Sequence, residues 1–271
     1  MVYCTLATMK KNLILLLVLL FSMAHSQNQK ISATKINQFT IDAEHFLGFD
    51  QFGYYYTLKN NIFNKIKNNQ SFEYKNISLG KITHIDKQNP LKIVLLYENF
   101  NTIILLDNQF NESQKINLSE NEIPIAATAV GLASQNRLWI YSNLTQQIGF
   151  FNYLKNTYQT ITPPFEGTLK YYESDFNTFQ WIDTRLNWYS CDIFGKITTL
   201  GTIPDFDFIQ FVSNQMVLFS KEGSFYFCDV EKNKIYPIEN VEKSWSNFYY
   251  KDQILSIFTN QEISNYKLKT P

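Results

Sequence analysis

Residue types that usually carry binding chemistry are scarce in this chain of 271 residues. Arg137 and Arg185 are its only arginines, and Lys plus Arg equal Asp plus Glu at 24 each. Nucleic acid demands clustered positive charge, so we predict no nucleic-acid partner. Beyond residue 26 the only histidines are His45 and His84. Because zinc needs three or four clustered ligands, we predict no metal site, and we expect no cofactor.

Catalytic motifs are missing as well. The chain has no Gly-x-Ser-x-Gly nucleophile turn and no glycine-rich phosphate loop. A glycosidase needs two carboxylates at a defined separation. Spacing alone does not pair the carboxylates near predicted strand ends, which are Glu173, Asp175, Asp183, Asp205 and Asp207. We therefore predict no catalytic residues and expect a binding protein rather than an enzyme.

The first 26 residues are typical of an export signal. Lys10 and Lys11 precede an uncharged apolar run over 13–21, and the small residues Ala24 and Ser26 follow. This run is shorter than the roughly 20 residues that cross a bilayer. We predict a signal peptide over 1–26 and a single domain over 27–271 without a membrane span. The remaining 22 basic and 24 acidic residues give a net charge of −2, which disfavours a strongly anionic ligand.

Two cysteines follow the predicted signal, Cys191 and Cys228. They occupy the same place in successive repeats, within Ser190–Ile193 and Phe227–Val230. A disulfide needs Cα atoms within about 7 Å, which equivalent positions of neighbouring repeats do not provide. We predict two buried thiols that pack as small apolar side chains.

A strand-rich unit of about forty residues recurs along the rest of the chain. Each unit has an apolar strand with a bulky residue at its end, at intervals of 37 to 44 residues: Leu58, Tyr97, Tyr141, Ile182, Phe219 and Phe258. Short runs of β-branched and aromatic residues between turn residues indicate about four strands per unit. This period and strand count predict an all-β fold, a six-bladed β-propeller, with five or seven blades as alternatives.

The last unit is short by one strand. Its three predicted strands end near the C-terminus, whereas residues 30–41 are strand-like and precede the first complete unit. Pairing the two ends would cover both exposed sheet edges. We therefore predict that Ile31–Ile36 forms the outer strand of the sixth blade. A transmembrane barrel is the competing all-β fold, but it needs strands of about 9–11 residues, longer than most strands here.

An Asp or Asn follows an apolar strand in four units, at Asp107, Asn152, Asp192 and Asp229. These side chains cap turns by accepting hydrogen bonds from the backbone two residues further on. Residues spread around a ring do not converge on one ion, so we interpret the four as turn caps.

The pattern strand-Asp-x-x-x-Gly/Asn-Lys-strand resembles the hairpins of exported bacterial β-propeller repeat proteins of the quinoprotein-like and NHL-like type. Asp192–Lys196 and Asp229–Lys234 show it best. The resemblance spans nearly all of the predicted mature chain and implies the propeller fold. These families contain both enzymes and binding scaffolds, so the resemblance selects no activity. The chain departs from them in that no Trp-Asp dipeptide recurs and no cofactor cluster of the quinoprotein enzymes is matched.

Loops at one end of a propeller commonly bind partners. We predict a partner site on those connecting blades, or second and third strands, where exposed aromatics near an arginine resemble interface anchors: Glu98, Phe100, Phe165, Glu166, Asp183, Arg185, Asp205 and Phe206. The opposite expectation is that these rings pack between blades. Our leading hypothesis is a scaffold that binds an envelope or outer-membrane protein, in the periplasm rather than at the surface. The alternative is a carbohydrate-binding or carbohydrate-active propeller.

Overall fold

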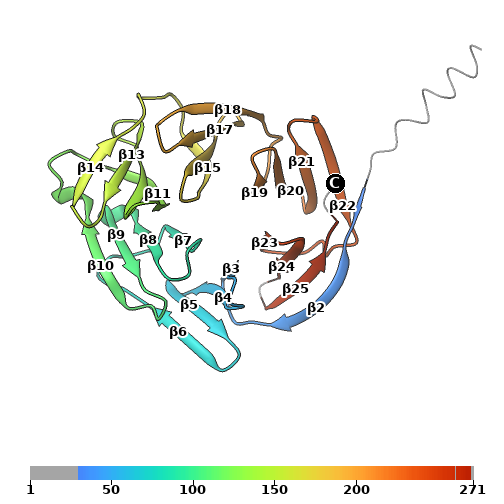
Figure 1. The fold of residues 1–271 in the computed structure, drawn as a ribbon. Coiled ribbons are helices and arrows are strands. Elements are labelled where there is room, and N and C mark those ends of the chain that lie inside the picture. The colour runs from blue at the N-terminus through green and yellow to red at the C-terminus, as the bar shows by residue number, and fades with distance from the viewer. Residues whose placement is uncertain (1–29, 260, 270–271) are drawn as a thin grey trace, which may run out of the picture.

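The protein forms a ring of six β-sheets around a central channel in a computed structural model (Figure 1), which describes residues 30–259 and 261–269. The predicted signal peptide lies outside these residues. Each sheet is one propeller blade in which consecutive strands pair antiparallel from the channel outward. The prediction of a six-bladed propeller with four-stranded antiparallel blades is therefore confirmed.

The first five blades each contain four consecutive strands, numbered from the channel outward. Blade 1 contains β3 (His45–Phe49), β4 (Tyr55–Lys59), β5 (Ile62–Lys67) and β6 (Gln70–Tyr74). Blade 2 contains β7 (His84–Asp86), β8 (Ile93–Tyr97), β9 (Thr102–Leu106) and β10 (Glu112–Asn117). Blade 3 contains β11 (Ala127–Ala133), β12 (Arg137–Ser142), β13 (Gln147–Asn152) and β14 (Thr157–Thr160). Blade 4 contains β15 (Leu169–Ser174), β16 (Thr178–Asp183), β17 (Asn187–Asp192) and β18 (Ile197–Thr202). Blade 5 contains β19 (Phe208–Ser213), β20 (Met216–Lys221), β21 (Ser224–Asp229) and β22 (Lys234–Glu239).

The sixth blade joins the two ends of the described chain. It contains β23 (Asn247–Lys251), β24 (Ile254–Phe258), β25 (Glu262–Lys267) and, as its outer strand, β2 (Thr34–Thr40). Figure 1 shows β2, in blue, beside β25, in red. The predicted closure is confirmed, but the outer strand lies further along the chain than Ile31–Ile36. Ile31–Ser32 forms β1, which pairs parallel with β22 of blade 5.

Side-chain burial explains why the middle strands of the blades are the most apolar. Every residue of β8 and β9 is buried, because the neighbouring blades cover both faces of the sheet. Such strands appear as continuous apolar runs instead of alternating patterns. Aromatic rings fill the space around the strands. For example, Phe63 stacks on Phe110 with ring centroids 4.7 Å apart.

The four predicted turn caps are confirmed. Asp107 Oδ1 accepts hydrogen bonds from the backbone N of Gln109 and of Asn111, and Asp192 Oδ1 accepts the equivalent pair in blade 4. Asn152 and Asp229 accept from backbone N–H groups two or three residues further on. All four lie in the turn between the third and fourth strands of a blade. Cys191 and Cys228 are buried and unpaired, as predicted.

The propeller has two ends, a loop face and a turn face. The loop face contains the connections between blades and between second and third strands, including the 3₁₀ helices η1 (Glu98–Phe100) and η2 (Leu118–Glu120). The turn face contains the connections between first and second and between third and fourth strands. Among the described residues, no helix is long and apolar enough to cross a membrane.

Glycine at position 48 allows blades 1 and 6 to approach. Gly48 has φ +103, and a Cβ added there would lie 2.5 Å from the Tyr249 ring. Gly53 has φ +80, but a Cβ there would meet nothing nearer than Lys67, at 3.8 Å. Left-handed backbone costs a non-glycine residue about 1–2 kcal/mol, and overpacking adds typically 1–3 kcal/mol.

We expect Gly48→Ala to lower the free energy of unfolding by about 3 kcal/mol, from backbone strain plus collision with Tyr249. Gly53→Ala is the matched control and should lower it by only about 1–2 kcal/mol. Denaturant unfolding of both variants measures the difference. Equal losses would contradict the close contact between blades 1 and 6.

Candidate functional site

Ionisable and aromatic side chains from several blades converge on the central channel. The innermost strands β3, β7, β11, β15, β19 and β23 surround it (Figure 1). The charge of Lys87, directly after β7, interacts with those of Asp50, Glu173 and Lys251, which belong to blades 1, 4 and 6. These residues are far apart in sequence and come together only because the ring closes. We take the turn-face end of this channel as the candidate functional site.

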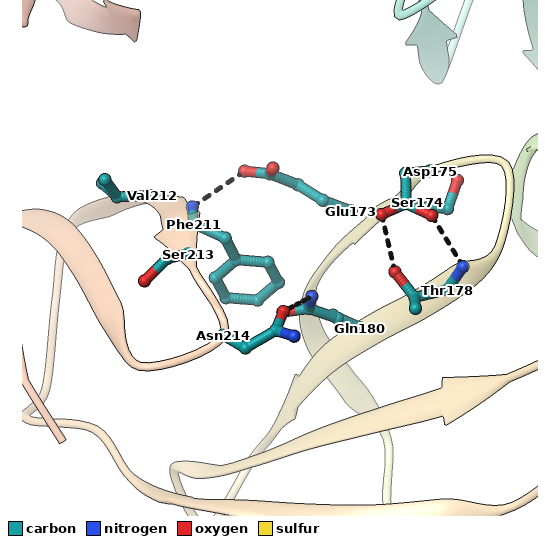
Figure 2. Close-up of a pocket in the computed structure, with 9 residues that line it drawn as sticks. All are labelled: Glu173, Ser174, Asp175, Thr178, Gln180, Phe211, Val212, Ser213 and Asn214. Atoms are coloured by element: carbon teal, nitrogen blue, oxygen red, sulfur yellow. Dashed lines mark hydrogen bonds between the residues drawn. The ribbon is translucent and has the colours of Figure 1, made fainter. Parts of the chain in front are cut away.

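Glu173 connects blade 4 to blade 5. Its Oε1 accepts a hydrogen bond from the backbone N of Phe211, at 3.1 Å, and another from the Tyr171 hydroxyl. Figure 2 shows the Glu173 side chain reaching across to the Phe211 backbone. Burial raises the pKa of Glu173 to about 7, although these hydrogen bonds and the nearby Lys87 act in the opposite direction. At neutral pH this carboxyl is therefore able both to accept and to donate a hydrogen bond.

Asp86 connects blade 2 to blade 3. Its Oδ2 accepts from the backbone N of Leu132 at 2.6 Å, and its Oδ1 accepts from the backbone N of Gln88 at 2.9 Å. The Gln88 side chain in turn donates to the carbonyl oxygen of Leu132, at 2.7 Å. Burial raises the pKa of the Asp86 carboxyl, while these hydrogen bonds lower it. Asp86 Oδ2 thus joins blade 2 to blade 3, while Oδ1 caps the turn that follows β7.

The same kind of contact recurs around the channel. Other side chains of the inner strands bond to the backbone of the neighbouring inner strand, in the pairs Tyr172–Val130, Gln210–Tyr250, Asn247–Phe46 and Tyr249–Phe49. Inner strands are sheet edges, and their backbone groups need partners. Many polar residues of the channel therefore have a structural role.

Lys87 differs from these residues. Its ammonium lies 4.4 Å from the centroid of the Tyr249 ring, a cation–π contact. Burial lowers its pKa to about 8, and Asp86 opposes this effect. Across the part of the chain that the structure describes, the ammonium makes no hydrogen bond and no ion pair within 4 Å. Its charge therefore contacts the face of an aromatic ring instead of a carboxylate.

The two histidines are in different environments. His84 packs on Tyr172, with ring centroids 4.6 Å apart, and burial lowers its pKa to about 4, so it is neutral at neutral pH. His45 begins β3 and is exposed. Within residues 30–259 and 261–269, no three His, Cys, Asp or Glu side chains are grouped in a way that would hold a metal ion.

A polar pocket lies between blades 4 and 5 at the turn face (Figure 2). Its volume is about 210 Å³. Gln180 Nε2 donates to Asn214 Oδ1 across the gap, at 2.8 Å, and Asp175 accepts two hydrogen bonds from Thr178. The nine residues that line it come from the β15–β16 and β19–β20 hairpins: Glu173, Ser174, Asp175, Thr178, Gln180, Phe211, Val212, Ser213 and Asn214. We call it the interblade pocket.

Two other cavities flank blades 1, 2 and 6. One, of about 540 Å³, lies at the turn face between blades 1 and 6, and its lining includes Asp50, Tyr249 and Lys251. Both carboxylate oxygens of Asp50 are used, since Oδ1 caps the turn at Phe52 and Oδ2 accepts from the Tyr56 hydroxyl. The other, of about 480 Å³, lies at the loop face beside Phe100.

The residues predicted from sequence to bind a partner all lie on the loop face, at the other end of the molecule from the interblade pocket. Glu98 and Phe100 form η1, and both are exposed. Glu166 and Arg185 are exposed as well. The structure does not bring the set into one cluster, because its members spread over blades 2 to 5.

The remaining four predicted residues are engaged within the protein. Phe165 stacks on Trp181 with centroids 4.9 Å apart, and Phe206 is buried. Asp183 is buried and caps its turn by accepting from the backbone N of Arg185, at 2.9 Å, and of Asn187.

Asp205 forms ion pairs with Lys170 and Lys221, which lower the pKa of its carboxyl. Of the three aromatic residues that suggested interface anchors, Phe165 and Phe206 thus pack inside the protein and Phe100 is exposed.

Sequence reasoning did not single out the pocket residues Gln180, Phe211 and Asn214. Glu173 and Asp175 were considered only as unpaired carboxylates. One signal was present: Glu173 is an ionisable residue at an inner position of a predicted first strand, where apolar residues are the norm. Its partner Phe211 lies 38 residues away, and only the packing of adjacent blades joins them.

Comparison with known proteins supports the fold. No family model matches the chain, and no curated protein matches its sequence. A member of the DUF4221 family from Bacteroides vulgatus has a similar structure, with a TM-score of 0.59 and 6% identity, covering 90% of this chain and 99% of that one.

Virginiamycin B lyase from Staphylococcus aureus is also similar, with a TM-score of 0.57 and 12% identity over 90% of this chain and 97% of the lyase. YCF48, solved bound to D1 peptide, has a TM-score of 0.55 and 9% identity over 88% of this chain and 99% of YCF48. At these identities the likeness shows the fold alone. The protein is thus a β-propeller similar to bacterial β-propeller proteins, whose functions include both catalysis and binding.

Titration of Glu173 makes the stability of the protein depend on pH. Because burial raises its pKa from 4.5 to about 7, the folded protein holds this proton more tightly than the unfolded chain does. The corresponding stabilisation is complete below pH 4.5 and is lost as the pH rises through 7.

We expect Glu173→Gln, which keeps an acceptor for Phe211 and Tyr171, to match the wild type at pH 4.5 and to be more stable by roughly 2 kcal/mol at pH 8. Denaturant unfolding at both pH values measures this. Glu166→Gln, at an exposed position, is the control with the same change of charge. A difference between wild type and Glu173→Gln that does not vary with pH would contradict the buried carboxyl.

Proposed function

We propose that this protein is a non-catalytic, exported β-propeller that acts as a protein-binding scaffold in the bacterial envelope. Its partner is an envelope or outer-membrane protein, and the binding surface is the loop face. The order of charged, apolar and small residues over 10–26 supports export.

The observation that carries this proposal is a group of exposed apolar side chains on adjacent loops of blades 1 to 3. Ile77, Phe100, Ile123 and Leu144 are 82%, 51%, 47% and 63% exposed. We call these four residues the loop-face patch. Exposed apolar groups gathered in one area of a soluble protein mark interaction sites, whereas single ones need no explanation.

Contacts between the loops show that these loops lie side by side. The Phe100 ring packs against Gly80, where an added Cβ would lie 3.2 Å from it. Asn101 Nδ2 donates a hydrogen bond to the carbonyl oxygen of Ile125, at 2.7 Å. The backbone N of Asn143 donates one to the carbonyl oxygen of Ala126, at 2.9 Å. The loops that contain Ile77, Phe100, Ile123 and Leu144 are thus fastened to one another in this order.

The surroundings of the patch fit a protein interface. The cavity of about 480 Å³ beside Phe100 is lined partly by Leu79 and Thr102, with Lys115 and Glu120 at its polar side. Glu98 is exposed next to it. An apolar centre, a receptive cavity and charges of both signs at the rim are the usual composition of a protein-binding surface.

The predicted carboxylates of the loop face favour binding over catalysis. Asp183 is used as a turn cap, and Asp205 is held between Lys170 and Lys221. Propellers of similar fold include a lyase, so the proposal is based on this surface and not on the fold.

Removing the apolar groups should release the partner. We expect chemical cross-linking and affinity capture from the native envelope to recover a partner with the wild type. Phe100→Ala combined with Leu144→Ala should lower this recovery at least about tenfold, as for the anchors of an interface.

The control is Leu154→Ala combined with Phe194→Ala, which removes two side chains of 70% and 85% exposure from the turn face. It should leave the recovery unchanged. Equal losses in both double variants, or a partner retained by the Phe100 and Leu144 variant, would count against the loop-face patch.

A further inference from the structure

The interblade pocket has unused hydrogen-bonding groups that the contacts between blades do not explain. We propose that it binds a small, neutral, polyhydroxylated ligand of about the size of one sugar ring. This site lies at the turn face, so it is separate from the loop-face patch and does not depend on the proposed protein partner.

The size of the pocket sets the size of the ligand. Its volume is about 210 Å³, whereas drug-sized ligands occupy pockets of about 300–1,000 Å³. A single sugar ring or a short polyol is therefore a better match than a longer chain or a nucleotide. The pocket lies between the two hairpins (Figure 2).

Three polar atoms of the pocket are available to a ligand. Asn214 accepts through Oδ1 from Gln180, but its Nδ2 donates no hydrogen bond within the described residues. Gln180 Oε1 is buried without a partner, and rotation about its terminal torsion would bring it to the cavity in place of Nε2, in exchange for the hydrogen bond to Asn214. Glu173 uses only Oε1 for Phe211 and Tyr171, so Oε2 is free. Together they offer a donor, an acceptor and a carboxyl group.

Hydroxyl groups fit this combination because each one donates and accepts at the same time. An unpaired buried polar atom costs about 1–3 kcal/mol, and a ligand hydroxyl that reached Gln180 Oε1 would recover part of this cost. Ser213 and Thr178 add hydroxyls to the same lining. Amide, hydroxyl and carboxyl groups on several sides of a small cavity select a ligand with several hydroxyls.

Charge argues against an anionic ligand, and the Asp175 carboxylate that would attract a cation already accepts three hydrogen bonds from Asn177 and Thr178. No Lys or Arg is among the nine lining residues, while Glu173 and Asp175 are both acidic. An anionic ligand would meet these carboxylates without a compensating cation. The ammonium of Lys87 is not part of the lining.

Phe211 provides the apolar wall of the pocket. Its ring is stacked on Trp188 with centroids 4.9 Å apart, and it meets Tyr171 edge-on at 5.2 Å. These contacts fix the ring in place, so the wall is preorganised. The C–H face of a sugar ring is apolar and would pack on such a wall while its hydroxyls meet the polar groups.

The test is binding of neutral monosaccharides to the complete protein, followed by ligand-observed NMR and calorimetry. The probes are glucose, galactose, mannose and N-acetylglucosamine, with glucuronate and glucosamine as charged counterparts. We expect saturable binding of at least one neutral sugar and weaker binding of the charged sugars. Asn214→Ala should weaken binding about tenfold, because one hydrogen bond is lost.

The matched control is Asp252→Ala, which changes the lining of the other turn-face cavity and should bind the sugar as the wild type does. Glu173→Gln should remove the variation of sugar binding between pH 6 and pH 8, because the amide does not titrate near 7 as the carboxyl does. If Asn214→Ala does not fold, as judged by its thermal transition, Ser213→Ala replaces it.

Three results would overturn the inference. The first is absence of saturable binding for every neutral sugar at millimolar concentration. The second is preference for glucuronate or glucosamine over the neutral sugars. The third is loss of binding in Asp252→Ala with retention in Asn214→Ala, which would assign the ligand to the cavity between blades 1 and 6. None of these results affects the loop-face patch, because partner capture is measured separately.

Discussion

Closure of the ring by backbone hydrogen bonds between the two ends of the chain is the constraint on which the structure depends. Thr34–Thr40 pairs with Glu262–Lys267 in blade 6, and Ile31–Ser32 pairs with Ile238–Glu239 in blade 5. A sheet edge with unpaired N–H and C=O groups invites aggregation, and pairing both ends covers it. Because the N-terminal segment contacts two blades, it joins them side by side. The channel and both faces exist only when this joint forms.

The ring also forces the inner strands to present edges to the channel. Side chains such as Asp86 and Tyr249 form hydrogen bonds with backbone groups at the edge of the neighbouring blade. Polar residues in the channel are therefore explained first by architecture. Among the described residues, two depart from this pattern: the Lys87 ammonium contacts the Tyr249 ring and makes no hydrogen bond, and Glu173 accepts its hydrogen bonds through one carboxyl oxygen. We infer function from ionisable residues whose polar atoms are not all used in contacts between blades.

The two ends of the propeller separate two kinds of surface. The loop face has apolar side chains on loops fastened to each other around blades 1 to 3, suited to a large partner. The turn face has the small polar interblade pocket between two hairpins, suited to a small molecule. Because the strands between them are almost fully buried, as in β8 and β9, the two surfaces share no side chains. Substitutions on one surface would therefore leave the side chains of the other surface in place.

The amino-acid sequence by itself determined the repeat, the number of blades, the pairing of the two ends, the free buried thiols and the turn caps at Asp107, Asn152, Asp192 and Asp229. The turn caps and the buried thiols depend on residues within about one repeat, and the number of blades and the pairing of the ends follow from a count of the strands. The sequence pattern is therefore sufficient to predict them. Tertiary structure alone decided the exact closing strand, the burial of Phe206 and the pocket shared by Glu173, Gln180 and Asn214. The physical reason is that these features depend on which residues of different blades face each other, and side-chain packing across a closed ring is not encoded in any short stretch of sequence.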